Sequence, residues 1–521
     1  MVIKGMDKSG RGELLFAPTT PLIEGNIMSF TSQPAEPGEF PSARLTKWAL
    51  IAFFLYFGLR LAFYALTIAP SVPPDEVTHF ALSRIFSRVL LLPVDSPETY
   101  QYGLVSHTPW LYYWLMGKVM PLNFSGLPDL TFLRLCNIPF ALGTVYFAWR
   151  TLRLLTEDRL TQLLLVILMT NTIMFTFLGA SVSYDNLANL LAAAAIYYLF
   201  AFFVKRDGSL LAASLLCQLA GCLTKTNLLP LALLLSLVLL ANERRNLGRL
   251  PGGMAAFFRG APAKAGLALL AIVVAFALNA QLYGGNYLKY RNISPEMGDV
   301  LSTEAALKYR TQARNIIFAM FKEGKVTKGK ALEMTSGITH EGDRGTVVAL
   351  IEEYDYQKRN QIEPFSPLEY IPIWIETMCT GVFGIFAHKA LPASGTKVLV
   401  FLSLIVVSVI GFAREWRPRE DGWLAGYLAL VAGCYGVFLM YFVNYRTYLD
   451  FYSTWLSLQG RYIFPVLAPA WILCSIYLLR LVRGRSMRLA LFAAAALIFI
   501  CSDFPYFITH VNSGWFAWPR G

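Results

Sequence analysis

The segment SVPPDEVTHF, residues 71–80, holds the residues best suited to acid–base chemistry. Its two prolines end one apolar stretch, and a new helix can begin at Asp75. On that helix Asp75 lies four residues and Glu76 three residues before His79, so the three side chains can share a face. A carboxylate whose pKa is tuned by an apolar wall can act as a general base. The structural alternative is an acidic first turn that complements the helix dipole, with His79 as an interfacial histidine.

A histidine and a group of aromatic rings follow in the segment SHTPWLYYWL, residues 106–115. His107 can face an anionic head group, while Trp110 and Tyr113 can line a groove for a sugar or a lipid. The same rings fit an aromatic belt at a membrane–water interface. Both interpretations stay open.

Two cations stand at the edges of apolar stretches later in the chain. Lys225 lies in LTKTN, residues 223–227, and Arg461 lies in QGRY, residues 459–462. A planar guanidinium suits a pair of phosphate oxygens, and an ammonium group suits a point contact. The structural alternatives are a snorkelling lysine and an arginine anchored by a carboxylate such as Asp450. Contact with a phosphate and these structural roles both stay open at this point.

Asp185 and Tyr462 are further candidates for lining the same site, together with His79, Trp110 and Tyr113. Asp185 opens an apolar stretch, where an acid can equally well start a helix. The seven cysteines are scattered without paired spacing, so neither a disulfide framework nor a metal cluster is predicted. The one cofactor left open is a divalent metal ion held weakly by Asp75, Glu76 and His79.

Membrane spans must position these residues. The chain of 521 residues is 56% hydrophobic and only 15% charged, with a mean hydropathy of +0.49. Soluble domains are about a quarter charged, so a soluble globular protein is excluded, as are a disordered chain and a disulfide scaffold. We therefore predict an all-α polytopic membrane protein with about eleven transmembrane helices and helical outer loops. The apolar stretches lie at 48–69, 131–149, 161–180, 186–204, 209–223, 226–241, 265–283, 396–413, 422–443, 462–479 and 489–507.

Lysine and arginine gather in alternate connections between these stretches, which the positive-inside rule places in the cytoplasm. The N-terminus is then cytoplasmic, the C-terminus lies outside, and every candidate site residue falls on the outer side. The net charge of +12 therefore indicates membrane topology and contact with anionic lipid. The sequence has no basic stripe on a soluble domain, which nucleic-acid binding would require. The predicted parts are a disordered cytoplasmic tail (1–45), an N-terminal transmembrane module (46–283) with a first outer loop (70–130), an outer loop with short helices and a candidate lid (284–395), C-terminal transmembrane helices (396–507) and an outer tail (508–521).

In chain order these segments resemble the GT-C class of integral-membrane glycosyltransferases, which includes the protein O-mannosyltransferases and the aminoarabinose transferases of lipid A. The 71–80 segment and QGRY with its following proline also resemble a group of bacterial membrane proteins. The resemblance covers roughly residues 48–240, and it departs from the pattern at Thr108, where many relatives have a second proline. The residues that carry it are Asp75 and Glu76, the segment HTPWLYYW at 107–114, Arg134, Gly143 and Thr144, and Thr224 with Lys225.

The resemblance implies transfer of a sugar from a polyprenyl-phosphate-linked donor to an extracytoplasmic acceptor, which is a cell-surface glycan, a lipid or a protein. It places the enzyme in the bacterial inner membrane. Asp75 would be the base, with Glu76 as its partner or alternate, and the anomeric carbon would be inverted. His107, Lys225 and Arg461 would bind the donor phosphate.

Two other functions stay open at this point. A transporter or flippase for lipid-linked sugars predicts charged residues at mid-membrane and a repeat between the halves, and the sequence shows neither. A polymer ligase would use the same lipid carriers but has no need of an acidic pair after the first span.

Overall fold

A computed structural model describes residues 41–517 except 245–256, 339, 419–421 and 457. Residues 43–521 form one compact unit. The described residues are helical apart from loops and one short antiparallel pair of strands, β1 (Ile385–Phe386) and β2 (Ala390–Leu391). The predicted all-α fold is therefore confirmed. The predicted cytoplasmic tail falls almost wholly outside the described residues, and its last residues already belong to the first helix.

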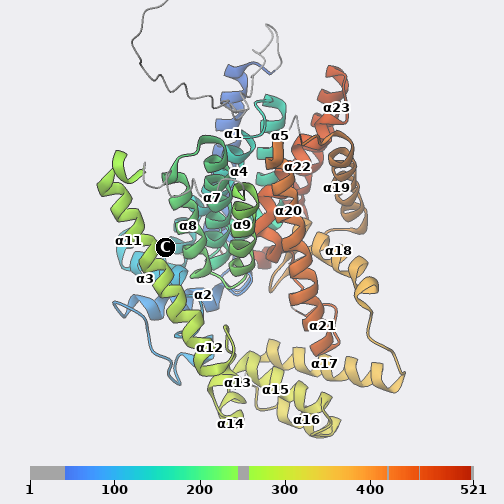
Figure 1. Ribbon diagram of the computed structural model, residues 1–521. Helices are drawn as coiled ribbons and strands as arrows, with labels where there is room; N and C mark the ends of the chain where they lie inside the picture. The colour runs from blue at the N-terminus through green and yellow to red at the C-terminus, as the bar shows by residue number, and fades with distance from the viewer. Residues whose placement is uncertain (1–40, 245–256, 339, 419–421, 457, 518–521) are drawn as a thin grey trace, which may run out of the picture. The chain divides into compact units, whose positions relative to one another are not determined.

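Eight helices of the described chain are long and apolar enough to cross a membrane, and they make this an integral membrane protein (Figure 1). A ninth span results if α5 (Arg159–Thr170) and α6 (Ile173–Gly179), which meet at a bend of 65°, are taken as one. The eight are α1 (Ala43–Thr67), α4 (Asp129–Leu152), α7 (Tyr184–Lys205), α11 (Pro262–Asn279) continuing to Tyr290 through α12 (Gly285–Tyr290), α19 (Gly395–Glu415), α20 (Gly422–Phe438) continuing through α21 (Arg446–Phe451), η6 (Gly460–Val466) with α22 (Leu467–Arg480), and α23 (Arg485–Ser502) with α24 (Phe504–His510).

Each of the eleven predicted stretches is helical, but the count of eleven exceeds the eight or nine spans of the described chain. The difference lies in α8 (Gly208–Cys222) and α9 (Leu228–Glu243), which have 15 and 16 residues. At 1.5 Å per residue they are about 22–24 Å long, short of a hydrocarbon core of about 30 Å. Because the two helices are consecutive, omitting both removes two crossings and leaves the predicted alternation of sides unchanged.

The centre of the bundle is formed by α7 and α22, whose apolar residues are mostly buried. Around them, α4 and α8 pack against α7, while α5 and α19 pack against α22.

One close approach between two backbone segments positions the QGRY segment. A Cβ on Gly460 would lie 2.3 Å from the backbone of Gly381 in α18 (Pro367–Phe383). Glycine at both positions lets the QGRY segment run against α18, which fixes the backbone at Arg461.

A buried ion pair that the sequence did not indicate joins α1 to the end of α23. Arg60 contacts Asp503 at 3.0 Å, and the Arg60 side chain is 2% exposed. Arg60 also donates to Asn171 at 3.1 Å, while the Thr176 hydroxyl donates to Asp503 at 3.0 Å. Charged side chains in a span are costly unless they are paired. Here the pair is enclosed by the bend between α5 and α6.

The two long connections that the sequence predicts as the first and second outer loops hold short helices, which gather at one end of the bundle. The first loop contains α2 (Glu76–Ser87), η1 (Tyr100–Tyr102) and α3 (Leu111–Val119). The second forms a small apolar core of its own, in which Phe318 stacks on Phe451 of α21 at 5.5 Å. In Figure 1 its helices lie at the end of the bundle where α12 and α21 also end. These helices are α13 (Met297–Val300), α14 (Thr303–Ala306), α15 (Arg310–Lys322), α16 (Lys328–Thr335) and α17 (Glu341–Arg359).

Candidate functional site

Asp75 is the residue directly before α2, in the turn that follows the two prolines. Its backbone is left-handed, with φ at 55°, a conformation that aspartate and asparagine tolerate better than most residues. The Asp75 carbonyl accepts a hydrogen bond from the His79 amide at 2.9 Å, but its carboxylate caps no amide of α2. The side chain is therefore turned away from the helix and is 52% exposed.

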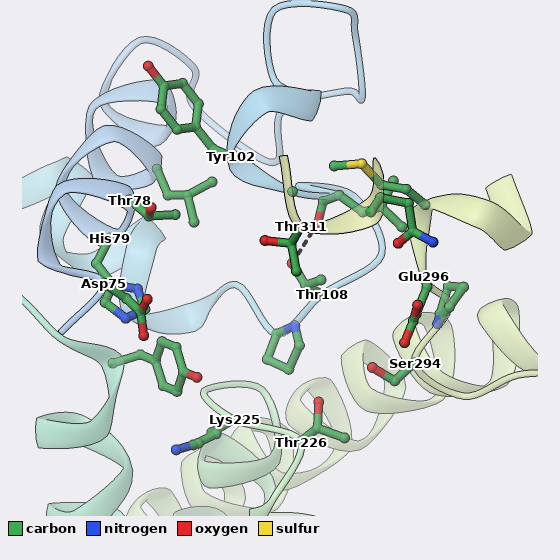
Figure 2. Close-up of a pocket in the computed structure, with 18 of the residues that line it drawn as sticks. Asp75, Thr78, His79, Tyr102, Thr108, Lys225, Thr226, Ser294, Glu296 and Thr311 are labelled. Carbon is green, nitrogen blue, oxygen red and sulfur yellow. Dashed lines mark hydrogen bonds between the residues drawn. The ribbon is translucent and has the colours of Figure 1, made fainter. Parts of the chain in front are cut away.

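A cavity of about 700 Å³ opens in front of Asp75. This volume lies within the range of about 300–1,000 Å³ that is usual for small-molecule sites. Figure 2 shows Asp75 and His79 on one wall, Lys225 and Thr226 on another, and Ser294, Glu296 and Thr311 from the second outer loop opposite. Of the predicted residues, the cavity is lined by Asp75, His79, Tyr113, Lys225 and Tyr462.

Four charged side chains meet at the foot of this cavity. Arg461 donates to Asp75 at 2.5 Å, although 386 positions separate the two residues. The other Arg461 nitrogen group, Nη1, lies 3.5 Å from Asp185, and Lys225 donates to Asp185 from the opposite side. Gln459 accepts from Arg461 Nε at 2.6 Å. The cluster thus holds two positive and two negative charges.

The electrostatics of the cluster keep Asp75 ionised. Desolvation beside the cavity opposes ionisation, but the charge of Arg461 and its hydrogen bond outweigh this effect. Together they lower the pKa of Asp75 to about 2. The sequence predicts a pKa tuned by an apolar wall, whereas the neighbouring guanidinium dominates here.

His79 is a buried neutral side chain with one ring nitrogen unsatisfied by the described residues. Burial lowers its pKa to about 4, although the charge of Asp75 opposes the shift. Its Nδ1 lies 2.9 Å from the Tyr113 hydroxyl, and its ring meets that of Tyr184 edge-on at 4.5 Å. Its Nε2 is buried and finds no hydrogen-bond partner in the described part of the chain. Such an atom costs free energy unless a ligand or water satisfies it.

Glu76 points in the opposite direction from Asp75. It is fully buried and pairs with Arg134 through both carboxylate oxygens, one of them at 2.8 Å from Nε. The amide of Val182 donates to the same carboxylate at 3.0 Å. Glu76 therefore does not face the cavity, and it does not join Asp75 and His79 in a common set of ligands. Among the described residues, no group of three or more His, Cys, Asp or Glu side chains is placed to hold a metal ion.

His107 and Trp110 lie beside the cavity rather than in its lining. His107 contacts Asn286 of α12 at 2.9 Å and Asp95 at 3.5 Å. Trp110 packs on the apolar cluster around Leu223. His107 thus joins the first loop to α12, and Trp110 joins it to the end of α8, close to Lys225 in the sequence.

Several residues at the site carry no functional prediction from the sequence. Gln459 belongs to the QGRY segment and Tyr184 directly precedes Asp185, so the sequence around the predicted residues contained the information needed to find them. Tyr309, Thr311 and Gln312 line the far wall of the cavity. Nothing in their local sequence distinguishes them, because their position depends on how the second outer loop folds.

Comparison with known proteins gives similarity of fold at low sequence identity. No protein-family model and no curated protein matches the sequence. The chain is similar in fold to GT-C glycosyltransferases. ArnT from Cupriavidus metallidurans in the apo state has a TM-score of 0.36 at 13% identity, with 83% of this chain and 77% of that chain covered. The same protein bound to undecaprenyl phosphate has a TM-score of 0.35 at 14% identity, covering 82% and 77%.

A second similar structure is the archaeal oligosaccharyltransferase AglB from Archaeoglobus fulgidus, in complex with an inhibitory peptide and a dolichol-phosphate. Its TM-score is 0.45 at 12% identity, with 91% of this chain covered. The alignment covers 57% of AglB, so this chain spans little more than half of that protein.

Proposed function

We propose that the protein is a membrane glycosyltransferase that moves a sugar from a polyprenyl-phosphate-linked donor to an extracytoplasmic acceptor. The observation that carries this proposal is a half-exposed carboxylate, Asp75, which lines one cavity together with Lys225 and forms an ion pair with the buried Arg461. A base for the acceptor and cations for the leaving phosphate are the two requirements of this chemistry.

In this proposal the reaction is a single displacement. Asp75 takes the proton of the acceptor hydroxyl as that oxygen attacks the anomeric carbon. The bond from the anomeric carbon to the phosphate oxygen breaks, and its electron pair stays on the phosphate, whose charge Lys225 and Arg461 stabilise. Asp75 then releases the proton to water. Since no covalent enzyme intermediate forms, the anomeric configuration is inverted.

The position of the cavity suits a donor that is anchored in a membrane. Lys225 lies in the connection between the apolar helices α8 and α9, and Arg461 lies at the start of the span that ends with α22. A phosphate bound there leaves the isoprenoid tail among the apolar spans. The alternation of basic connections supports a position of this end of the bundle outside the cytoplasm.

The alternative of a transporter finds no support in the position of the charges. A transporter needs polar or charged groups along a path through the bilayer. The ion pair between Arg60 and Asp503 lies within the spans, but both residues are almost fully buried, and neither lines the cavity. A polymer ligase remains distinguishable by its acceptor, which would be a growing glycan chain.

Replacing Arg461 with alanine is expected to reduce the use of the donor by about 10²–10³-fold, because a buried donor of hydrogen bonds to the leaving phosphate is lost. The measurement is kcat/KM for a polyprenyl-phosphate sugar in liposomes. Arg446→Ala is the matched control, since Arg446 is an exposed arginine at the same end of the bundle that contacts the Phe442 ring. Wild-type kcat/KM in a folded Arg461→Ala protein would remove the phosphate assignment.

A further inference from the structure

We propose that Asp75 and the donor phosphate compete for Arg461, so that the general base is released only in the donor-bound enzyme. This inference rests on the proposed function and adds a coupling between donor binding and activation of the base. It makes the ion pair between Asp75 and Arg461 the resting state of the site rather than its reactive state.

Asp75 lines the cavity in front of Arg461, and this position is the first reason to expect competition. Asp75 lines the cavity, whereas Arg461 lies beneath it and is only 3% exposed. Arg461 Nη2 already donates to Asp75, the cavity-lining partner, at 2.5 Å. A phosphate in the cavity can reach this nitrogen only if the Asp75 carboxylate moves aside.

The charges of the cluster are balanced before a donor binds, and this balance is the second reason to expect competition. Lys225 and Arg461 are matched by Asp75 and Asp185, so a phosphodiester that enters adds a negative charge to a balanced cluster. Like charges at short distance repel strongly where water is scarce. Departure of one carboxylate restores the balance.

Asp75 is the carboxylate that can leave. The Asp185 side chain is 3% exposed and lies between Lys225 and Arg461, whereas the Asp75 side chain is 52% exposed. Rotation of Asp75 breaks no capping bond in α2, because its carboxylate makes none there. Arg461 keeps the Gln459 contact throughout, and its buried Nη1 stays 3.5 Å from Asp185.

The release has a direct chemical consequence. Away from the guanidinium, the pKa of Asp75 returns toward the ordinary value for aspartate of about 3.9, which makes it a stronger base than in the resting pair. The remaining groups that face it are His79, which is neutral, and His388. Donor binding thereby creates the base that the acceptor requires.

The test is the affinity of the purified protein in nanodiscs for undecaprenyl phosphate as the probe. Asp75→Asn removes the competing charge and suits the left-handed backbone. We expect it to bind the probe about tenfold more tightly than wild type, the size of one charge-assisted hydrogen bond. Asp75→Ala should tighten binding as well. Glu296→Gln is the matched control, because it removes an acid from the same cavity that makes no ion pair with Arg461, and it should change the affinity less than about twofold.

The same measurement in an Arg461→Ala background separates competition from a general charge effect. Competition predicts that Asp75→Asn then produces no further tightening. Equal or weaker binding by folded Asp75→Asn and Asp75→Ala proteins would overturn the competition, as would equal tightening by Glu296→Gln. A separate result would contradict the proposed function. If the wild type and Arg461→Ala bind the probe equally well, Arg461 does not bind the donor phosphate.

Discussion

Replacing Asp75 with asparagine is expected to reduce sugar transfer by about 10²–10⁴-fold, the contribution typical of a positioned general base. The amide keeps the size and the backbone preference of the residue but cannot accept the proton of the acceptor. Glu76 cannot substitute for it, because both oxygens of Glu76 are engaged by Arg134 in a buried pair. The measurement is the rate of release of polyprenyl phosphate from a polyprenyl-phosphate sugar in liposomes.

Asp450→Asn provides the matched control for this variant. Asp450 is an exposed acid at the same end of the bundle, and the sequence offers it as a partner for Arg461. The structure instead pairs Arg461 with Asp75 and Asp185, so Asp450→Asn should transfer sugar at the wild-type rate. Unchanged transfer by Asp75→Asn, with an unaltered melting temperature, would mean that another group takes the proton.

Replacing Arg134 with methionine is expected to destabilise the protein by about 3–5 kcal/mol, because it leaves the buried Glu76 carboxylate without its cation. Arg134 also donates to the carbonyls of Ala65 and Ile68, at 3.3 Å and 2.5 Å, and so joins the end of α1 to α2 and α4. The apparent melting temperature in detergent, followed by tryptophan fluorescence, should fall clearly below that of wild type.

Two further variants identify the cause of this loss. Arg153→Met removes an exposed arginine at the end of the same helix, whose ring contact is with Trp149, and should leave the melting temperature nearly unchanged. Replacing Glu76 and Arg134 together with methionine should recover part of the stability, because no buried charge is then unpaired. A double variant no more stable than Arg134→Met would show that the unpaired carboxylate is not the cause.

Local patterns predict much of this structure, because each depends on residues that are close in sequence. Apolar composition locates every helix of the bundle. Relative to a count of nine spans, it overestimates the number at α8 and α9, where helix length rather than composition decides. The proline pair also predicts the start of α2 at Asp75 and Glu76. The chain direction at that turn, however, sends the two neighbouring carboxylates to opposite sides, which residue spacing on an ideal helix does not anticipate.

The assembly of the cluster lies beyond such patterns. Arg461 reaches Asp75 across 386 positions because Gly460 approaches Gly381 closely, and neither event follows from local sequence. Motif order can nominate both residues but cannot show that they form an ion pair. A motif match can also nominate a residue that lies elsewhere. His107 lies in a matching motif, but it contacts Asn286 and Asp95 rather than the other predicted phosphate ligands.

An experimental structure of the wild-type protein with undecaprenyl phosphate in nanodiscs shows directly whether the two cations bind the donor phosphate. We expect the phosphate to lie within hydrogen-bond distance of both Lys225 and Arg461, in the cavity that Asp75 lines. A phosphate bound elsewhere, with Lys225 and Arg461 still engaged only by Asp185 and Asp75, would contradict the proposed phosphate site.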